Sequence, residues 1–332
     1  MLRHFSFAGA ALLAAGLCQA QINPIPQTGG LSGSVSLGAS YSNVSSNFYQ
    51  HDDNGRIDTL GSPQSQGSAS VIPNFDLRYT LAESRTQFVL GNQIHDALRF
   101  DLTQWLAVRQ EISNLGIVSA GFVFSGIIPG DVWSDPYKTG SDRTSTGRDS
   151  RGFRLGWEGI MGSSLSADLT ARKIDIENEE SGRSATLSAS QAALLDRNGD
   201  SLRLRVSYDW EFAPGHFLAP GLILGRDDLD GKAMSHDTTG LKLDYGFRTG
   251  SNIFSASLYL AHQSFDEGNP LFGNRKANSN DYALGFVYLR QGIFGMPSLG
   301  AFINASYGES NADIDFFDAK FTRLGIGLRY KF

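Results

Sequence analysis

Charged side chains recur at alternate positions in several segments of this 332-residue chain. In the clearest segment, residues 202–212, Arg203, Arg205, Asp209 and Glu211 alternate with leucines, a valine and aromatic residues. A period of two places the charges on one face of a β-strand and the apolar residues on the other. Arginine keeps its charge and can bind a carboxylate through two parallel hydrogen bonds, so such a face could bind anionic solutes.

The same alternation predicts a larger set of residues that face the interior of a closed sheet. These candidates are Asp76, Arg78, Arg109, Glu111, Arg154, Glu158, Asp168, Arg172, Arg203, Arg205, Asp209, Glu211, Lys242, Asp244, Arg248, Arg323, Arg329 and Lys331. The arginines could guide anionic solutes through a water-filled interior. Alternatively, cross-strand pairs of acids and bases stiffen and hydrate that interior. The similar frequencies of acids and bases favour this second interpretation.

The run HDDNGR, residues 51–56, is the nearest approach to a catalytic motif. It is similar to the His-x-Ser-Asn-Gly-Arg run of outer-membrane phospholipases, whose His and Ser are the base and the nucleophile. The position that matches the Ser is Asp53, so the nucleophile is missing. Asp-Asn-Gly is also an ordinary turn sequence. With no GxSxG motif or phosphate-binding glycine loop, we expect no enzyme activity.

Metal and cofactor sites are not expected either. Residues 196–200 and 227–231 look like fragments of calcium loops, but neither completes the acidic pattern of such a loop. Ordinary turns explain them better, although weak divalent binding by an external acidic loop stays open. The histidines at 95, 216, 236 and 262 are isolated, and Cys18 is the only cysteine.

Alternating apolar faces predict about fourteen strands, or twelve if the weakest are discounted. They lie within residues 31–41, 75–81, 88–90, 102–108, 118–124, 153–157, 165–171, 202–212, 218–224, 241–247, 254–260, 282–288, 299–307 and 322–332. Their connections alternate between long polar segments, such as 127–150, and short turns. Residues 184–200 hold either a short helix or extensions of the flanking strands. Short turns at one end and long loops at the other are typical of outer-membrane barrels.

An all-β, transmembrane, antiparallel up-and-down barrel explains these features together. A soluble sandwich buries its apolar faces between two sheets, and it would not explain charged residues opposite so many apolar faces. No apolar run after residue 20 is long enough for a spanning helix. A closed barrel is then the structure that satisfies its backbone hydrogen bonds in lipid. We therefore expect periplasmic turns, extracellular loops and contact with outer-membrane lipid.

Both ends of the chain support this location. Residues 1–20 combine a short basic region, an apolar stretch and small residues, which is typical of a signal peptide, and residues 21–30 read as an irregular lead-in before a barrel over 31–332. At the other end, Leu328, Tyr330 and Phe332 share an apolar face. A terminal strand ending in Phe resembles the signal that the barrel-assembly machinery recognises. A net charge of −6 argues against a nucleic-acid partner.

Several stretches together resemble a bacterial family of outer-membrane proteins catalogued only as a domain of unknown function. They are IPQTGGLSGSVSLGASYSNVSSN (25–47), FVFSGIIPGDVWSDPYKTG with the following SDRTSTGRDSRGFRLGWEGIMG (122–162), KIDIENEESG (173–182) and LLDRNGD (194–200). The resemblance implies an outer-membrane barrel and brings no substrate and no catalytic residues.

We predict from the sequence a passive channel or porin-like uptake barrel for small solutes, anionic ones included. A fatty-acid-type transporter of hydrophobic compounds is an alternative, but it would need an apolar pocket and a sizeable N-terminal plug. A structural or adhesive barrel that acts through its external loops is another.

Overall fold

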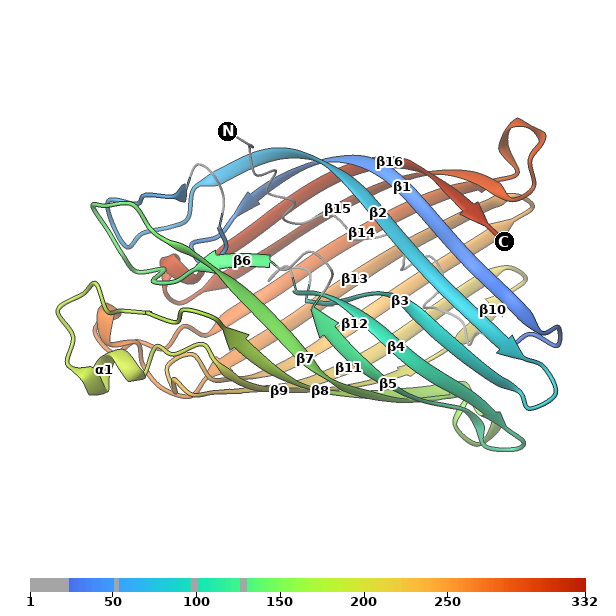
Figure 1. Ribbon diagram of the computed structural model, residues 1–332, viewed down its shortest axis with the longest axis horizontal. Coiled ribbons are helices and arrows are strands. Elements are labelled where there is room, and N and C mark those ends of the chain that lie inside the picture. The colour runs from blue at the N-terminus through green and yellow to red at the C-terminus, as the bar shows by residue number, and fades with distance from the viewer. Residues whose placement is uncertain (1–23, 51–53, 97–100, 126–129) are drawn as a thin grey trace.

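The chain forms one closed antiparallel barrel of fourteen strands, as the sequence predicts (Figure 1). The computed structural model describes residues 24–50, 54–96, 101–125 and 130–332. The predicted signal peptide (1–20) and residues 51–53 of the HDDNGR run lie outside these ranges. The barrel closes where the last strand pairs with the first, from Ser34 opposite Lys331 to Ser45 opposite Lys320.

The strands run in sequence order around the barrel, each paired with its neighbours. Their bounds are β1 (Gly30–Ser45), β2 (Ser65–Leu81), β3 (Thr86–Asp96), β4 (Asp101–Ile112), β5 (Gly116–Ser125), β6 (Gly130–Trp133), β7 (Ser145–Glu158), β8 (Leu165–Ile176), β9 (Gly199–Tyr208), β10 (Trp210–Ala213), β11 (His216–Leu229), β12 (His236–Thr249), β13 (Asn252–Phe265), β14 (Ser279–Gln291), β15 (Leu299–Ala312) and β16 (Ala319–Lys331). The short β6 pairs with β7 and forms an isolated bridge from Val132 to Tyr49, and β10 continues the line of β9 against β11. These two short strands therefore do not add to the fourteen.

Alternation along each strand separates a lipid-facing surface from an interior surface. On β16, Leu324 and Ile326 are 65% and 62% exposed. Arg323, which immediately precedes Leu324, is only 3% exposed. Residues with the parity of Leu324 thus point outward and those with the parity of Arg323 point inward. In a bilayer the outer apolar residues contact lipid, and barrel closure leaves no sheet edge between β16 and β1.

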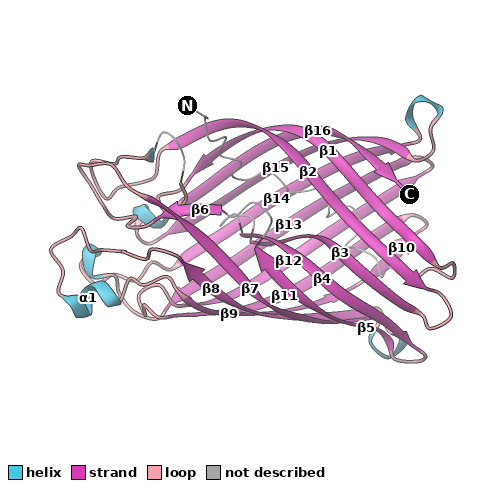
Figure 2. Ribbon diagram, viewed as in Figure 1, coloured by secondary structure: helices cyan, strands magenta, loops and turns pink. Residues whose placement is uncertain are grey.

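The two ends of the barrel differ in the length of their connections. Residues 82–85, 113–115, 214–215 and 250–251 are short turns at the end that holds Phe332. The opposite end carries longer connections, including 177–198 and 266–278. Figure 2 shows that the few helical turns lie in connections at the two ends. Within the described ranges, no helix is long and apolar enough to cross a membrane.

Several strands extend further than the apolar pattern indicates. Residues 127–150 were expected to form a connection, but β6 and the first part of β7 lie within them. The outward positions there include Asp149 and Arg151, both exposed. A strand that continues above the bilayer meets water on its outer face, so its apolar alternation is lost while its backbone pairing persists. In residues 184–200, a five-residue helix, α1 (Ala189–Ala193), begins at the capping residue Ser188.

One part of the wall is incompletely paired. β2 pairs with β1 over its whole length, but it pairs with β3 only from Leu81 to Asp76, which lies opposite Gly91. Among the described residues, the other half of β2 has no strand partner on that side, and β3, β4 and β5 are shorter than β7 (Figure 1). Pro73, which cannot donate a ladder hydrogen bond, lies in this half of β2, as expected of an edge strand.

Candidate functional site

The interior wall has a charged sector, formed by the inward charges of β4, β7, β8, β9 and β12. At its centre, Asp168 of β8 bridges two arginines from neighbouring strands. Its Oδ1 lies 3.0 Å from Nη2 of Arg154, and its Oδ2 lies 2.7 Å from Nε of Arg205. All three side chains are a quarter exposed or less. The carboxylate therefore separates two cations that would otherwise repel each other in a poorly solvated site.

A second pair extends the charged sector toward β4. Nη2 and Nε of Arg109 donate to Oε2 and Oε1 of Glu158 at 2.8 and 3.3 Å. Nη1 of Arg109 donates to Oε1 of Gln87 at 2.7 Å. This guanidinium is thus engaged on both sides and is only 3% exposed. Such a fully partnered cation stabilises the wall rather than offering itself to a solute.

On β12, the charges are neutralised within the strand. Nζ of Lys242 lies 2.9 Å from Oδ2 of Asp244. Oδ1 of the same carboxylate accepts a hydrogen bond of 2.6 Å from Oγ of Ser257 on β13. In this sector the structure supports the interpretation that cross-strand pairs stiffen the interior.

At the periplasmic rim, paired charges also hold the lead-in. Nε and Nη2 of Arg78 donate to both carboxylate oxygens of Asp76 at 2.6 and 2.9 Å. Glu111 pairs with Arg85, a turn residue that the sequence analysis did not select. Arg85 also donates to the backbone oxygen of Ile25, which is buried. The lead-in is therefore attached to the barrel rim.

The remaining predicted residues are spread along the wall and are not gathered at one point. Nη1 of Arg172 donates to Oγ of Ser150 at 3.0 Å. Oδ2 of Asp209, between β9 and β10, accepts from Oγ of Ser166 at 3.3 Å. Glu211 lies by the β10–β11 turn and accepts from the backbone N–H of Gly215 at 3.1 Å. Other members on inward positions are Arg203, Arg248, Arg329 and Lys331.

The opposite side of the interior is a serine sector, formed by inward residues of β15, β16, β1 and β2. Hydroxyl pairs join β1 to β2: Ser40 lies 3.1 Å from Ser70, and Ser42 lies 3.3 Å from Ser68. Small hydroxyl side chains line most of this wall, whereas Asp76, Arg78, Arg329 and Lys331 lie on it near the periplasmic rim. The stretch that holds the serine pairs is therefore polar but carries few fixed charges.

Arg323 of β16 lies among these serine hydroxyls, away from the charges near the periplasmic rim. It lies between Ser42 of β1 and Ser306 of β15 in the strand register. Its side chain is buried, and Nε and Nη1 have no hydrogen-bond partner among the residues that the structure describes. A buried guanidinium without a partner is energetically costly, which makes it unlike the arginines of the charged sector.

A loop cap covers the external end of the barrel. We use this name for the cluster of buried residues Tyr137, Leu195, Ala233, Phe265, Ala277, Ile314 and Phe316 with the partly buried Phe48, Ile57, Leu60, Leu187, Leu194, Leu271, Phe272 and Phe317 packed against it. These residues come from six connections at the external end. The β1–β2 and β8–β9 connections leave opposite sides of a fourteen-stranded ring, so their contact requires that the loops cross the mouth.

Phe316 lies at the centre of the loop cap and is fully buried. Its ring stacks on Tyr137 with centroids 5.1 Å apart and meets Phe48 and Phe272 at 5.6 Å each. Aromatic pairs of this kind each contribute about 0.5–1.5 kcal/mol beyond the burial of their area. The cap is thus a small hydrophobic core rather than a set of solvated loops.

Buried charges fasten the loop cap to the strands below it. Nη2 of Arg197 lies 2.8 Å from Oε2 of Glu179, and Arg197 also donates to the backbone oxygen of Trp133 at 2.7 Å. Burial outweighs this ion pair and raises the pKa of the Glu179 carboxyl. Arg143 donates to backbone oxygens of Asn47 and Asn54, and burial lowers its pKa to about 10.

Asp135 ties two of the loops together through their backbones. Its Oδ1 accepts from the N–H groups of Tyr137 and Gly182 at 3.0 and 2.9 Å, and its Oδ2 accepts from that of Ser184 at 2.9 Å. One carboxylate thus satisfies three backbone donors, two of them buried. The pKa of the Tyr137 hydroxyl is raised by burial.

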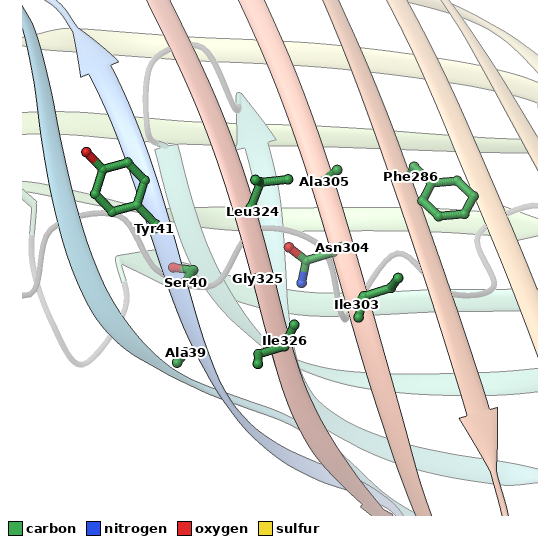
Figure 3. A pocket seen from close by; sticks show the side chains of 10 residues that line it. All are labelled: Ala39, Ser40, Tyr41, Phe286, Ile303, Asn304, Ala305, Leu324, Gly325 and Ile326. Carbon is green, nitrogen blue, oxygen red and sulfur yellow. The ribbon is translucent and has the colours of Figure 1, made fainter.

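The outer surface has a shallow apolar groove of about 400 Å³ over β1, β14, β15 and β16. Figure 3 shows the side chains that line it, among them Tyr41, Phe286 and Leu324. The groove forms where the small side chains of Ala39 and Ala305 leave the outer face low. Since it opens on the lipid-facing side, a lipid acyl chain is sufficient to fill it. The predicted assembly-signal residues Leu328, Tyr330 and Phe332 are also on this outer, exposed face.

The two rejected metal motifs lie where strands meet connections: residues 196–198 precede β9, whereas residues 227–229 belong to the end of β11, so the turn interpretation was wrong for them. Oδ1 of Asp196 accepts from the N–H of Asn198, whose own Oδ1 accepts from the N–H of Ile176. Among the histidines, His236 pairs with Asp227, with Nε2 3.1 Å from Oδ2. Within the described part of the chain, no group of three His, Cys, Asp or Glu residues is placed to hold a metal ion.

Comparison with protein families shows which family the chain belongs to. The family described as "Protein of unknown function (DUF2860)" matches residues 30–331, which is nearly the whole barrel. The chain belongs to the DUF2860 family. The match agrees with the resemblance to an outer-membrane family of unknown function. No curated protein sequence is detectably similar to the chain.

Solved structures with a similar fold are outer-membrane barrels of low sequence identity. A deltaS2 mutant of the monoaromatic hydrocarbon channel TodX aligns with a TM-score of 0.50 at 9% identity, covering 93% of this chain and 92% of that one. A Pseudomonas aeruginosa FadL homologue gives 0.45 at 11% identity, covering 97% and 96%. An anion-selective porin from Comamonas acidovorans gives 0.38 at 12% identity, covering 92% and 99%. At these identities the comparisons concern the fold alone, which places this DUF2860 protein among bacterial outer-membrane barrels.

The loop cap is the feature of this DUF2860 barrel that sequence reasoning missed. The external connections were interpreted as polar, yet they carry Phe48, Tyr137, Phe272, Phe316 and Phe317. Isolated aromatics in polar segments were the available signal. Their convergence could not be predicted, because it depends on which connections meet across the mouth.

Proposed function

We propose that this DUF2860 protein is a gated outer-membrane channel for the uptake of small polar solutes. The observation that carries the proposal is a hydrophilic interior, charged on one side and hydroxyl-lined on the other, beneath a packed loop cap. Charged and hydroxyl side chains on an interior wall can replace part of the hydration shell of a passing solute. Solute entry from outside then requires that the loop cap opens.

A comparison of wild-type protein with Phe316→Ala in planar bilayers tests this proposal. Removing a fully buried Phe costs about 3–5 kcal/mol, which is enough to shift a closed cap toward open states. We expect rare, brief currents from the wild type and frequent, longer openings from the variant.

The matched control is Phe153→Ala, which removes the same group from the lipid-facing surface, where Phe153 is 67% exposed. It should leave the opening frequency unchanged. If both wild-type and Phe316→Ala barrels are folded and carry no current, the channel proposal is wrong.

A second candidate function has one observation in its favour. Among the described residues, half of β2 has no strand partner on the side of β3. This is a weak place in the wall, through which a transporter could pass apolar compounds sideways into the membrane. Near the last β2–β3 pair, an amide chain bridges the strands: Nδ2 of Asn92 donates to Oδ1 of Asn74 at 2.7 Å, and Gln104 donates to Asn92 at 3.2 Å. This arrangement holds the strands together by side chains instead of backbone pairing.

The double variant Asn74→Cys, Asn92→Cys distinguishes the two functions, because an oxidised disulfide would lock β2 to β3. Oxidation should block the passage of an apolar fluorescent probe if the compound leaves through the wall. It should leave ion conductance unchanged if polar solutes follow the interior. Unchanged probe uptake after complete oxidation would eliminate the lateral path.

A further inference from the structure

Arg323 has the surroundings of a ligand-binding residue rather than of a structural one. It is 3% exposed, and no described residue forms a hydrogen bond or an ion pair with its guanidinium group. Another deeply buried arginine of the interior, Arg109, is held by Glu158 and Gln87. A cation that is removed from water without compensation is retained where something else supplies the counter-charge.

The groups around Arg323 are also short of partners. Oγ of Ser306, directly opposite it on β15, is buried without a hydrogen-bond partner among the described residues, as is Oδ1 of Asn304. On the other side lies Ser42, whose hydroxyl is 3.3 Å from that of Ser68. Since native proteins satisfy most buried polar atoms, a cluster of unsatisfied ones at a single place indicates a missing ligand. Hydroxyl hydrogens rotate and an amide can be flipped, so these groups can all donate toward one acceptor.

Apolar residues bound this polar cluster along the barrel axis. Toward the external end, Phe321 packs with Val44 and Tyr259, and both Phe321 and Val44 are 4% exposed. Toward the periplasmic end, the ring of Phe302 lies over Gly327, where an added Cβ would come within 2.5 Å of Cζ. The next two positions after Arg323 on the inner face of β16 are Gly325 and Gly327, which leave the space to neighbouring side chains.

We propose that Arg323, with Ser42, Ser306 and Asn304, binds the carboxylate of a small organic acid whose apolar part lies against Phe321 and Val44. A guanidinium can receive both oxygens of a carboxylate, and hydroxyl and amide donors can satisfy the remaining lone pairs. The apolar boundary favours an organic acid over a fully hydrated inorganic anion. The role of this site in uptake rests on the proposed channel function, but binding to the site can be tested without transport.

The test is calorimetric titration of the folded, detergent-solubilised full-length barrel with three probes. Pentanoate carries the carboxylate and an apolar body, pentanamide is its neutral counterpart, and inorganic phosphate is an anion without the apolar body. We expect pentanoate to bind at least tenfold more tightly than either of the others. Arg323→Met should weaken pentanoate binding by about 10- to 100-fold, the loss of one charge-assisted contact. Arg323→Lys, which keeps the charge but not the planar pair of donors, should be intermediate.

The matched control is Lys320→Met, which removes a cation from the outer, half-exposed side of the same strand. It should bind pentanoate as the wild type does. Equal binding by Arg323→Met and wild type, no pentanoate binding by the wild type, or binding of phosphate in preference to pentanoate would each overturn the assignment. Arg323-dependent binding by a barrel that carries no current would leave the site intact and reject the channel, so the two proposals fail separately.

Discussion

In the charged sector, Asp168 accepts from the guanidinium groups of both Arg154 and Arg205. In the serine sector, by contrast, Arg323 has hydroxyl and amide neighbours and no carboxylate partner among the described residues. Both arrangements place arginine on the inner face of a strand in the same barrel. The first is complete without any other molecule, and the second is not. The difference indicates that a lumen-facing arginine should be judged by its partners, because only an uncompensated charge has free energy to gain from a ligand.

Asp168→Ala should produce the largest effect, because it would leave Arg154 and Arg205 without a counter-charge, as Arg323 is. The substitution leaves two buried guanidinium groups side by side. We expect the free energy of unfolding to fall by about 3–5 kcal/mol, measured by urea titration of the barrel in lipid vesicles. Asp149→Ala, at an exposed outward position of β7, should change it by less than about 0.5 kcal/mol. A loss below about 1 kcal/mol in Asp168→Ala would show that water already compensates the two arginines.

Arg323→Met should change stability in the opposite direction. Without ligand, the substitution removes an unpartnered buried cation, so we expect the free energy of unfolding to rise by about 1–3 kcal/mol. The same urea titration on Arg109→Met, which breaks the pair with Glu158, should show a decrease. If both variants lose stability equally, the contrast between the two sectors does not hold.

The loop cap lies between these two cases. Glu179 pairs with Arg197, yet burial still raises the pKa of its carboxyl. Since the pKa of Glu179 is higher in the folded cap than in an opened one, the cap is favoured by protonation. This contribution is fully present below the ordinary value of 4.5 and is lost as pH rises through the higher folded value. The opening frequency in bilayers should therefore increase with pH in that window, by a factor of at most about ten per pH unit.

Glu179→Gln should reduce that pH dependence while leaving a cap that can still close. The comparison is made between slopes, so a uniform change in opening frequency does not affect it. An identical slope in the variant would assign the pH dependence to another group, such as Asp318, whose pKa is also raised by burial.

Asp76→Asn should have the smallest effect. Asp76 and Arg78 form a close pair, but their side chains are 40% and 27% exposed at the rim. Exposed ion pairs contribute at most about 1 kcal/mol. We expect urea titration to detect a change within that limit. If Asp76→Asn lowers the free energy of unfolding as much as Asp168→Ala does, pairing and not burial decides how much a lumen charge contributes to stability.

Much of the architecture could be predicted because a barrel imposes a local rule on its sequence. Each spanning strand must place apolar residues toward lipid at every second position, and this is visible in Leu324, Ile326 and Leu328 without any knowledge of the partner strands. The rule also predicts which charged residues face inward. It stops at the edge of the bilayer, which is why the outer part of β7 was interpreted as a loop.

The sequence by itself determined the barrel, its approximate strand number and the inward position of Arg323, because alternation is a property of one strand at a time. Only the tertiary structure decided that Asp168 compensates two arginines while Arg323 has no partner in the described part of the chain, since the distance between side chains depends on strand register. It also decided that Phe48, Tyr137 and Phe316 form a cap. Their contact depends on loops from opposite walls meeting over the mouth, and no local pattern encodes such a meeting.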